Sequence, residues 1–314
     1  MRILHLSDTT LSGNPLQISR LLQKFGGDVG SRHLVWAPTS GFRTFDTDLV
    51  AETMPEDELA YWLHEWADVI HYHDGWKKLK VLRHLGIAPP KKVSVIQVHS
   101  PRSWIDDLTS AFATKVPVAM TAHLNIEGWP EADFVVPGVL DITDAAYLPL
   151  RQCLRSQPTI SHAPSNWAAR GWEGESFTVV NPMLTALRDA GEINYQLIVK
   201  RPHKEVLALK RHSDIGVDEI FDGSCGLSSL EYLALGVPCF ADISERVRAG
   251  IKELTGATDL PWLDGSAGSL KRNVGDLVRA KMWQVYGERS RLWMETYWKP
   301  ETLVNHYLEM YRSL

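Results

Sequence analysis

The sequence predicts an α/β protein made of two Rossmann-like domains, each with a parallel sheet covered by helices. The chain has 314 residues, which suits two domains of roughly 150 residues better than one large core. Short apolar runs alternate along it with segments of helical period, which is the pattern of parallel sheets. Apolar residues make up 44 % of the sequence, enough to bury two sheets.

In the first half, six apolar runs are expected to form strands. They are Arg2–Leu6, Arg32–Trp36, Val69–Tyr72, Val93–Val98, Val118–Ala122 and Phe134–Val136. Helices are expected near Pro15–Phe25, Glu56–Trp66, Trp76–Leu85 and Ile105–Ala113. Several strands end in polar loops that contain histidine. Ligands of open α/β sheets bind outside these carboxyl ends.

A second α/β series begins after Pro149. Its expected strands are 159–163, 177–180, 195–199, 215–217 and 238–241, and its expected helices lie near 182–190, 204–211, 226–235 and 268–286. We therefore predict an N-terminal domain over 1–150, a second domain over 151–298 and a final helix over 299–314. This helix carries an apolar stripe that includes Leu303 and Tyr307, and we expect it to pack back on the N-terminal domain.

Charge and cysteine content exclude several classes of protein. The net charge is −5, so no global field draws in nucleic acid or acidic lipid. Three cysteines without a pattern argue against a disulfide framework or a zinc site and indicate a reducing, cytoplasmic setting. The N-terminus is typical of a first strand and not of a signal peptide. No run approaches the roughly 18 apolar residues that span a bilayer.

The most informative stretch runs from Ile220 to Pro238. Small residues precede a helix that is expected to begin near Gly226, where free backbone amides form a site for an anion such as a diphosphate. Glu231 lies just over one turn further on, where a carboxylate can accept hydrogen bonds from ribose hydroxyls. An ordinary α/β crossover with a surface glutamate explains the same pattern equally well, so both interpretations stay open.

This stretch resembles the donor-site signature of the GT-B glycosyltransferases of sequence family four. In that family a Glu-x7-Glu motif runs into a helix and ends in Gly-x-Pro. The matching positions are Gly226, Leu227, Glu231, Ala234, Gly236 and Pro238. The first glutamate falls on Gly223 and is missing, with Asp222 as the nearest substitute. The resemblance implies that Ser228 and its neighbours also line the donor site.

A second segment resembles the same family. His162-Ala163-Pro164-Ser165-Asn166, followed by Arg170-Gly171, is similar to the strand and loop that open the family's second domain. The resemblance implies that Arg170 grips the donor diphosphate, which a guanidinium can do bidentately. The family often has another arginine where this chain has Ser165, and Lys200 is the residue expected to compensate.

In the first domain, Ser12, Gly13 and Asn14 follow the first strand, at the site of the family's glycine-rich loop. His99 matches the family histidine beside the transferred sugar, although a structural hydrogen bond is an equally good explanation. His73, Asp74, Trp76 and Trp104 lie at strand ends or near loops and are assigned to the acceptor side. Core filling is the alternative for the tryptophans.

The resemblance implies two Rossmann-like domains whose parallel sheets face each other across a cleft. It implies a hexosyl- or pentosyltransferase that moves a sugar from a nucleotide sugar, with UDP favoured, to an acceptor hydroxyl with retention of configuration. His99, Arg170 and Glu231 would act at the reacting groups. Basic side chains and helix-end amides would neutralise the leaving diphosphate, so no cofactor or metal is expected. Asp46-Thr47-Asp48 is the spacing of a metal site in the other glycosyltransferase fold, but a solvated turn is the simpler interpretation.

Two alternatives remain beside this function. The acceptor could be a hydroxymethylated pyrimidine in DNA, with phosphates tracked by basic segments. These segments are Lys77-Lys78-Leu79-Lys80, Lys91-Lys92 and Lys200-Arg201. A degenerate transferase that only binds a nucleotide or a partner is the second alternative, suggested by the missing glutamate and by Ser165.

Overall fold

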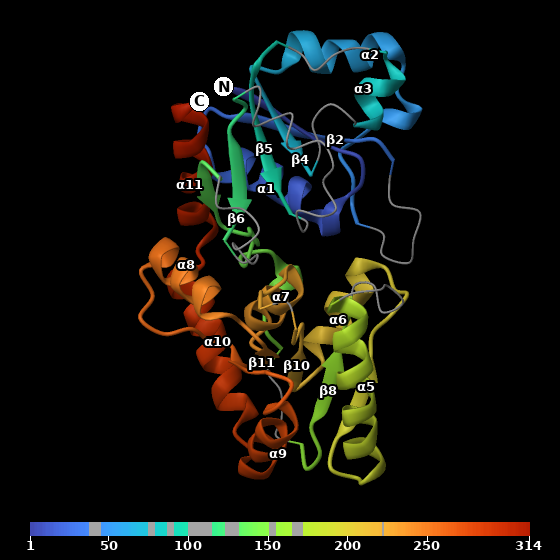
Figure 1. Cartoon of the computed structure of the whole chain (residues 1–314), viewed down its shortest axis with the longest axis vertical. Helices are drawn as coiled ribbons and strands as arrows, with labels where there is room; N and C mark the ends of the chain where they lie inside the picture. The colour runs from blue at the N-terminus through green and yellow to red at the C-terminus, as the bar shows by residue number, and fades with distance from the viewer. Residues whose placement is uncertain are drawn as a thin grey trace. The chain divides into compact units, whose positions relative to one another are not determined.

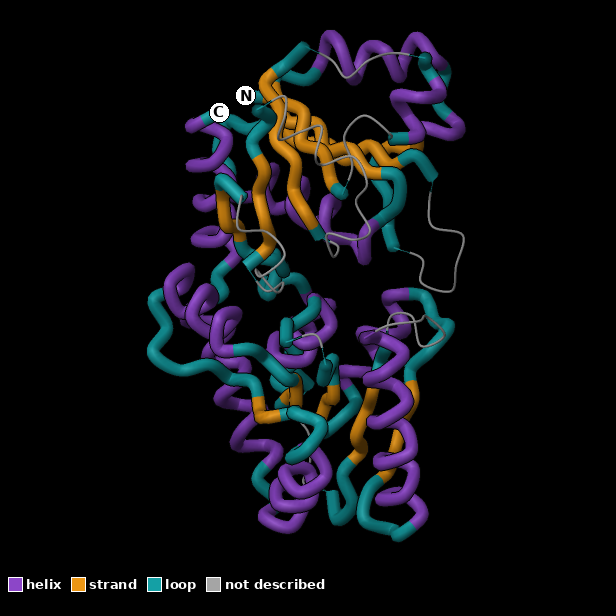
Figure 2. The backbone as a smooth tube through the Cα atoms, in the orientation of Figure 1, coloured by secondary structure: helices purple, strands orange, loops and turns teal. Residues whose placement is uncertain are grey.

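In a computed structural model, the chain is described over residues 1–37, 45–74, 79–86, 91–99, 115–122, 132–150, 155–164, 172–221 and 223–314, with the side chains of 172–175 excepted. These residues form two compact units. The first combines the described residues of 1–122 and 132–139 with Pro300–Leu314, and the second holds those of 140–299. Strands and helices alternate within each unit (Figure 2).

The first unit contains a seven-stranded parallel sheet in the order β3-β2-β1-β4-β5-β6-β7. Its strands are β1 (Arg2–Ser7), β2 (Gly30–Val35), β3 (Leu49–Val50), β4 (Val69–His73), β5 (Val93–Val98), β6 (Val118–Thr121) and β7 (Phe134–Val136). The strand order reverses between β1 and β4. Such a reversal is where open α/β sheets place their ligands.

The two faces of this sheet differ in chemistry. One face carries Leu4, Leu6, Ile70, Tyr72, Ile96 and Val98, which form an apolar core together with residues of α2 (Glu56–Ala60), η3 (Tyr61–Trp66) and α3 (Lys80–His84). The opposite face carries histidines. His5 pairs in register with both His33 and His71, so the three side chains share that face. Alternation along each strand separates the two sets.

Helices α1 (Asn14–Phe25) and α11 (Pro300–Ser313) cover the histidine face. Ser19 of α1 accepts a hydrogen bond from Ser31 of β2 at 3.0 Å. From α11, Tyr311 contacts His71, and the Tyr307 hydroxyl donates to the carbonyl of Pro137 at 2.7 Å. Figure 1 shows α11 beside the last strands of the first sheet, although most of the second unit separates them in sequence. Short 3-10 turns, η1 (Leu11–Gly13) and η2 (Ala51–Thr53), complete this unit.

The second unit contains a five-stranded parallel sheet in the order β12-β11-β10-β8-β9. Its strands are β8 (Thr159–His162), β9 (Asn194–Leu197), β10 (Ile215–Val217), β11 (Cys239–Ala241) and β12 (Leu263–Asp264). The other elements are η6 (Ala145–Tyr147), α5 (Trp172–Asp189), α6 (His203–Arg211), α7 (Leu227–Ala234), α8 (Glu245–Thr255), α9 (Leu270–Ala280) and α10 (Trp283–Tyr297). Its strand order reverses between β8 and β10.

Arg291 of α10 joins three segments of the second unit. Its guanidinium donates to the carbonyls of Ala234 at 2.6 Å, Tyr147 at 3.0 Å and Ile142 at 3.1 Å. The first of these carbonyls is the last residue of α7, so a positive charge lies at that helix's C-terminus, where it is favourable. The contact fixes the far end of the helix that begins at Gly226.

The predicted fold class, two parallel α/β sheets, is confirmed, and most predicted strands occur within one or two residues of their predicted ends. The strand predicted at 177–180 is wrong, because these residues lie inside helix α5, which also contains Pro182. The single helix predicted over 268–286 is divided into α9 and α10 by Lys281, which has a left-handed backbone with φ of 52°. None of the described helices is long and apolar enough to cross a membrane.

Gly216 provides a test of the packing beneath α7. A Cβ at Gly216 would lie 2.6 Å from the ring of Tyr232, whose hydroxyl is held 2.9 Å from that of Ser161. We expect Gly216→Ala to lower the free energy of unfolding by about 1–3 kcal/mol, as overpacked cores do. Gly268→Ala is the control, because nothing lies within 4 Å of its Cβ position and its φ is not in the left-handed range. Equal urea midpoints for the two variants would contradict the packing argument.

Candidate functional site

The helix that the sequence predicts near Gly226 is α7, which follows β10, one of the two strands between which the strand order of the second unit reverses. Gly226 is the N-cap, with an extended backbone and no side chain of its own to cap the helix, and the buried Asp218 carboxylate lies beside it. The first-turn amides of Leu227 and Ser228 therefore point out of the helix as donors. The chemistry that such an end offers is the binding of an anion, with a phosphate as a typical occupant.

Glu231 is buried in α7 and is held by two basic side chains. Its Oε1 lies 2.6 Å from Nε2 of His203, and its Oε2 lies 2.6 Å from Nζ of Lys210. Lys210 also donates to the carbonyl and the hydroxyl of Ser228, at 3.1 and 2.8 Å. Burial alone would raise the pKa of Glu231, but Lys210 and His203 lower it to about 2. The carboxylate is therefore ionised at neutral pH and tied to the first turn of its own helix.

His203, Lys210 and Asp218 are site residues that the sequence did not indicate. Asp218 follows β10 and is buried, and its Oδ2 lies 3.6 Å from where a Cβ of Gly226 would be. Burial raises the pKa of Asp218, against the opposing charge of Lys210. Lys210 lies 21 residues before Glu231, a spacing that matches no local motif, so only the folded chain brings the two together.

Gly223 occupies the position of the missing family glutamate, and its backbone conformation would strain any side chain there. Its φ is +69°, and a Cβ would lie 3.2 Å from Cβ of Ser244. The Gly223 carbonyl also accepts a hydrogen bond from the Ser244 amide at 2.8 Å. The absence of a glutamate here follows from a tight left-handed turn that only glycine adopts without strain.

Of the remaining donor-side residues predicted in the second half of the chain, the structure describes only Lys200. Lys200 is exposed beyond β9 with a left-handed backbone, at φ of 55°. Ser165, Asn166, Arg170 and Asp222 lie outside the residues that the structure describes, so their roles stay predictions.

In the first unit, the predicted loop follows β1. Leu11, Ser12 and Gly13 have positive φ values of 44°, 56° and 82°, and Gly13 is the N-cap of α1. A Cβ at Gly13 would lie 2.8 Å from the Phe45 ring. Non-glycine residues in this backbone region cost about 1–3 kcal/mol each and cluster at functional sites. The amide nitrogen of the Asn14 side chain donates to the carbonyl of Leu11 at 3.3 Å and supports the turn.

His73, Asp74 and His99 meet at the ends of β4 and β5. The Asp74 carboxylate accepts a hydrogen bond from the His99 amide at 2.6 Å. Nδ1 of His73 lies 2.7 Å from Nε2 of His99. His73 is fully buried, whereas His99 is only partly buried. Trp76 and Trp104 lie outside the described residues, and their assignment to the acceptor side is untested.

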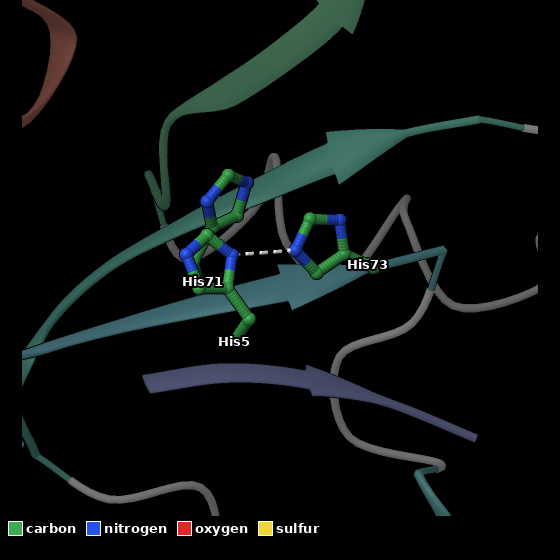
Figure 3. A group of neighbouring side chains, drawn as sticks. All are labelled: His5, His71 and His73. Carbon is green, nitrogen blue, oxygen red and sulfur yellow. Dashed lines mark hydrogen bonds between the residues drawn. The ribbon is translucent and has the colours of Figure 1, made fainter. Parts of the chain in front are cut away.

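Behind His99, further histidines fill the same face of the sheet (Figure 3). Nδ1 of His5 lies 2.9 Å from Nε2 of His73, and Nδ1 of His71 lies 2.6 Å from the Tyr311 hydroxyl. Burial lowers the pKa of His5, His71 and His73 well below the usual value, and neighbouring histidines add to the effect for each. Burial also lowers the pKa of His33 to about 4 and of His99 to about 3. All five imidazoles are neutral at neutral pH.

Among the described residues, one group could hold a metal ion. His5, His71 and His73 each offer a nitrogen, and these atoms lie within 4.8 Å of one another. The Asp-x-Asp at 46–48 is engaged by arginines instead. Asp48 makes two 2.7 Å hydrogen bonds with Arg32, and Asp46 lies 3.4 Å from Arg20.

Similar solved structures are glycosyltransferases at very low sequence identity. They include an alpha-glucosyltransferase in complex with UDP and a 13-mer DNA containing a central A:G mismatch, with a TM-score of 0.63 at 10 % identity over 99 % of both chains. Sucrose-phosphate synthase from Thermosynechococcus elongatus has a TM-score of 0.59 at 12 % identity, over 100 % of this chain and 98 % of that one. HepE of Anabaena, in complex with UDP and glucose, has a TM-score of 0.59 at 12 % identity over the whole of both chains.

The chain has the GT-B fold. No protein-family model matches the sequence, and no curated protein does. The likeness therefore lies in the fold and not in the sequence. In each unit of this GT-B chain, the structure describes some of the site residues predicted from the sequence. These residues lie at or beyond carboxyl ends of strands, or in the helix that follows.

The buried histidines predict a steep loss of stability in mild acid. His5, His33, His71 and His73 are at most 1 % exposed, and their pKa values are lowered in the folded state. The unfolded chain therefore binds protons below pH 6.5 that the folded chain does not, so stability present above pH 6.5 is lost as the pH falls. Each histidine contributes about 1.4 kcal/mol per pH unit, and the four together about 5.

Urea unfolding between pH 8 and pH 5 measures this slope. We expect His33→Gln to reduce it by about 1.4 kcal/mol per pH unit, while His64→Gln, at an exposed position of η3, leaves it unchanged. A free energy of unfolding that stays flat between pH 7 and pH 5 would show that these imidazoles are not neutral in the fold.

The Glu231 network predicts a large cost for removing its lysine. Lys210→Met leaves a buried carboxylate without its main partner, and we expect a loss of about 3–5 kcal/mol in the free energy of unfolding. Adding Glu231→Gln should recover part of it. Arg201→Met, which breaks an exposed pair with Glu205, is the control and should cost at most about 1 kcal/mol. Similar losses for the two single variants would contradict the buried pair.

Proposed function

We propose that this chain is a glycosyltransferase that moves a sugar from a UDP-sugar to an acceptor hydroxyl. The α7 N-terminus carries the proposal. It lies at a strand-order reversal of a GT-B fold, the amides of Leu227 and Ser228 make no hydrogen bond within the described part of the chain, and the Lys210–Glu231 pair fixes the helix in place. UDP occupies several solved proteins of this fold. A diphosphate at α7 would gain backbone hydrogen bonds and the field of the helix.

Within this proposal, the second unit binds the donor. The α7 amides hold the diphosphate, Arg170 neutralises it and Glu231 receives the ribose. Both Glu231 oxygens already accept one hydrogen bond, but each has a further lone pair for a ribose hydroxyl. His203 and Lys210 keep the carboxylate charged and oriented. The departing diphosphate is stabilised by these groups, and we propose that transfer proceeds with retention and without a metal.

The first unit would position the acceptor. The strained turn at Leu11–Gly13 follows β1, at the reversal between β1 and β4, and the half-buried His99 follows β5 and contacts His73 at the end of β4. This location is where the fold class places a ligand. His99 would meet the transferred sugar, and His73 and Asp74 would hold His99 in place.

A modified base in DNA is a second candidate acceptor. The observation that favours it is the full-length likeness to an alpha-glucosyltransferase bound to UDP and DNA. Among the basic segments, Lys92 donates to the carbonyl of Ala67, whereas Lys80, Lys91 and Lys200 are exposed. Glucosylation of hydroxymethylated DNA with binding that weakens steeply in salt would support this acceptor. Turnover of small acceptors without DNA binding would exclude it.

Substitution of Arg170 tests the donor site. UDP at 100 times its dissociation constant should stabilise the protein by roughly 2.7 kcal/mol, seen as a rise in Tm. We expect Arg170→Ala to abolish most of this rise and all transfer while the unliganded Tm is unchanged. Arg279→Ala, which removes an exposed charge from α9, is the matched control. If no nucleoside diphosphate raises the Tm of the wild type, the proposed donor site is wrong. Stabilisation by UDP-sugars without transfer to any of a panel of acceptors would favour a binding protein.

A further inference from the structure

Three histidines form a continuous chain of hydrogen bonds from the core of the first unit to His99. Nδ1 of His5 lies 2.9 Å from Nε2 of His73, and Nδ1 of His73 lies 2.7 Å from Nε2 of His99 (Figure 3 shows the first contact). His5 and His73 are fully buried on neighbouring strands, β1 and β4. The outer ring, His99, is partly exposed, and its Nδ1 makes no hydrogen bond within the described part of the chain.

Because each ring is neutral, each carries one N–H and one lone pair. Only two arrangements then satisfy both contacts. In the outward arrangement, Nδ1–H of His5 donates to His73, Nδ1–H of His73 donates to His99, and His99 carries its proton on Nδ1. In the inward arrangement every donor is reversed, His99 presents a lone pair at Nδ1, and His5 carries its proton on Nε2.

The buried end of this chain of hydrogen bonds, at His5, decides between the two arrangements. Nε2 of His5 is buried and has no hydrogen-bond partner among the described residues. The inward arrangement would place an N–H there without an acceptor, and orphaned buried N–H groups are the rarest kind in proteins. The outward arrangement leaves only a lone pair.

For His33, beside His5 in the sheet, the contacts determine which ring nitrogen carries the proton. The Ser7 hydroxyl donates to the carbonyl of Thr9 at 2.6 Å, so toward His33 it can only accept. His33 therefore carries its proton on Nε2. Its buried Nδ1, which has no partner in the described chain, is a lone pair. On this face of the sheet, Nδ1 of His33 is the unpaired nitrogen whose protonation state is determined by its neighbours. It carries no proton.

We propose that His5 and His73 are positioning residues that lock His99 in the Nδ1–H tautomer, so that His99 offers the site a hydrogen-bond donor and not a base. This inference rests on the proposed function for what the donor meets, namely an oxygen of the sugar or of the acceptor. To take a proton at Nδ1, His99 would first need the inward arrangement, with its orphaned N–H at His5. The lock suits a transfer in which His99 orients an oxygen and removes no proton from it.

A metal ion shared by His5, His71 and His73 is the competing explanation of the cluster. Zinc at about 2.0–2.1 Å from each nitrogen in a tetrahedral site needs nitrogens about 3.4 Å apart. Here the His5–His73 pair is closer, at 2.9 Å, and the set extends to 4.8 Å. Both nitrogens of His73 are already engaged at hydrogen-bond distances. The geometry is therefore that of shared protons.

The test is the tautomer of His99, read by long-range proton–nitrogen NMR on histidine-labelled full-length protein near pH 7.5, without substrate. We expect the wild type to carry the proton on Nδ1. His5→Asp and His5→Asn form a matched pair, because an ionised Asp can only accept, whereas the Asn amide can donate to His73. His5→Asp should reverse the direction of the hydrogen bonds and move the proton of His99 to Nε2. His5→Asn should leave that proton on Nδ1.

If His5→Asp does not fold, His73→Phe replaces it. That variant frees Nε2 of His99, and we expect a shift toward the Nε2–H form that predominates for free histidine. A purely structural role for His5 or His73 would not move this tautomer. An Nε2 proton in the wild type, an unchanged tautomer in both His5→Asp and His73→Phe, or one equivalent of tightly bound zinc would overturn the proposal. Because the measurement uses no substrate, a correct tautomer without sugar transfer would refute the proposed function alone.

Discussion

The first unit depends on keeping a layer of buried imidazoles neutral. His5, His33, His71 and His73 occupy positions where a sheet usually places aliphatic side chains, and α1 and α11 pack directly over them. A proton on any one of them would be a charge in the core beside other imidazoles, which burial makes very costly. Neutral rings are tolerated because neighbours supply partners, such as Ser7 to His33 and Tyr311 to His71. The same layer reaches the end of β4, where His73 contacts His99, so the buried imidazoles are continuous with the predicted site residue His99.

The second unit handles buried polarity in the opposite way, by pairing full charges. Glu231 is ionised because Lys210 and His203 flank it, and Lys210 also binds the carbonyl and hydroxyl of Ser228. This arrangement ties the end of α6 to the first turn of α7. The arginine of α10 holds the other end of α7. Under the proposed function, the first-turn amides of α7 would receive an anion, and these contacts would hold the helix in place when that charge arrives.

The sequence was sufficient for the fold class because strands such as β5 and β10 are short apolar runs that coincide with their predicted bounds. It misled at 177–180, where a β-branched run resembled a strand. Val180, Leu184 and Leu187 are spaced as one face of a helix, and all three are buried in the core of the second unit. The strands β3 and β12 have two residues each and leave no periodic signal. The position of the α7 start was readable from its glycines. The partners of Glu231 were not, because they are 21 and 28 residues away and are joined only by packing.

The missing family glutamate coincides with a backbone conformation that disfavours any side chain. Gly223 has a left-handed φ, and its carbonyl accepts from the amide of Ser244, whose hydroxyl in turn accepts from the Val247 amide and caps α8. A Cβ at Gly223 would press on Ser244 at 3.2 Å and strain the turn. A glutamate at this position would have to adopt the strained φ and displace Ser244, which caps α8, by a few tenths of an ångström. If this chain is a transferase, as proposed, the contact that the family glutamate makes with the sugar has to come from another group, because Gly223 offers only its backbone.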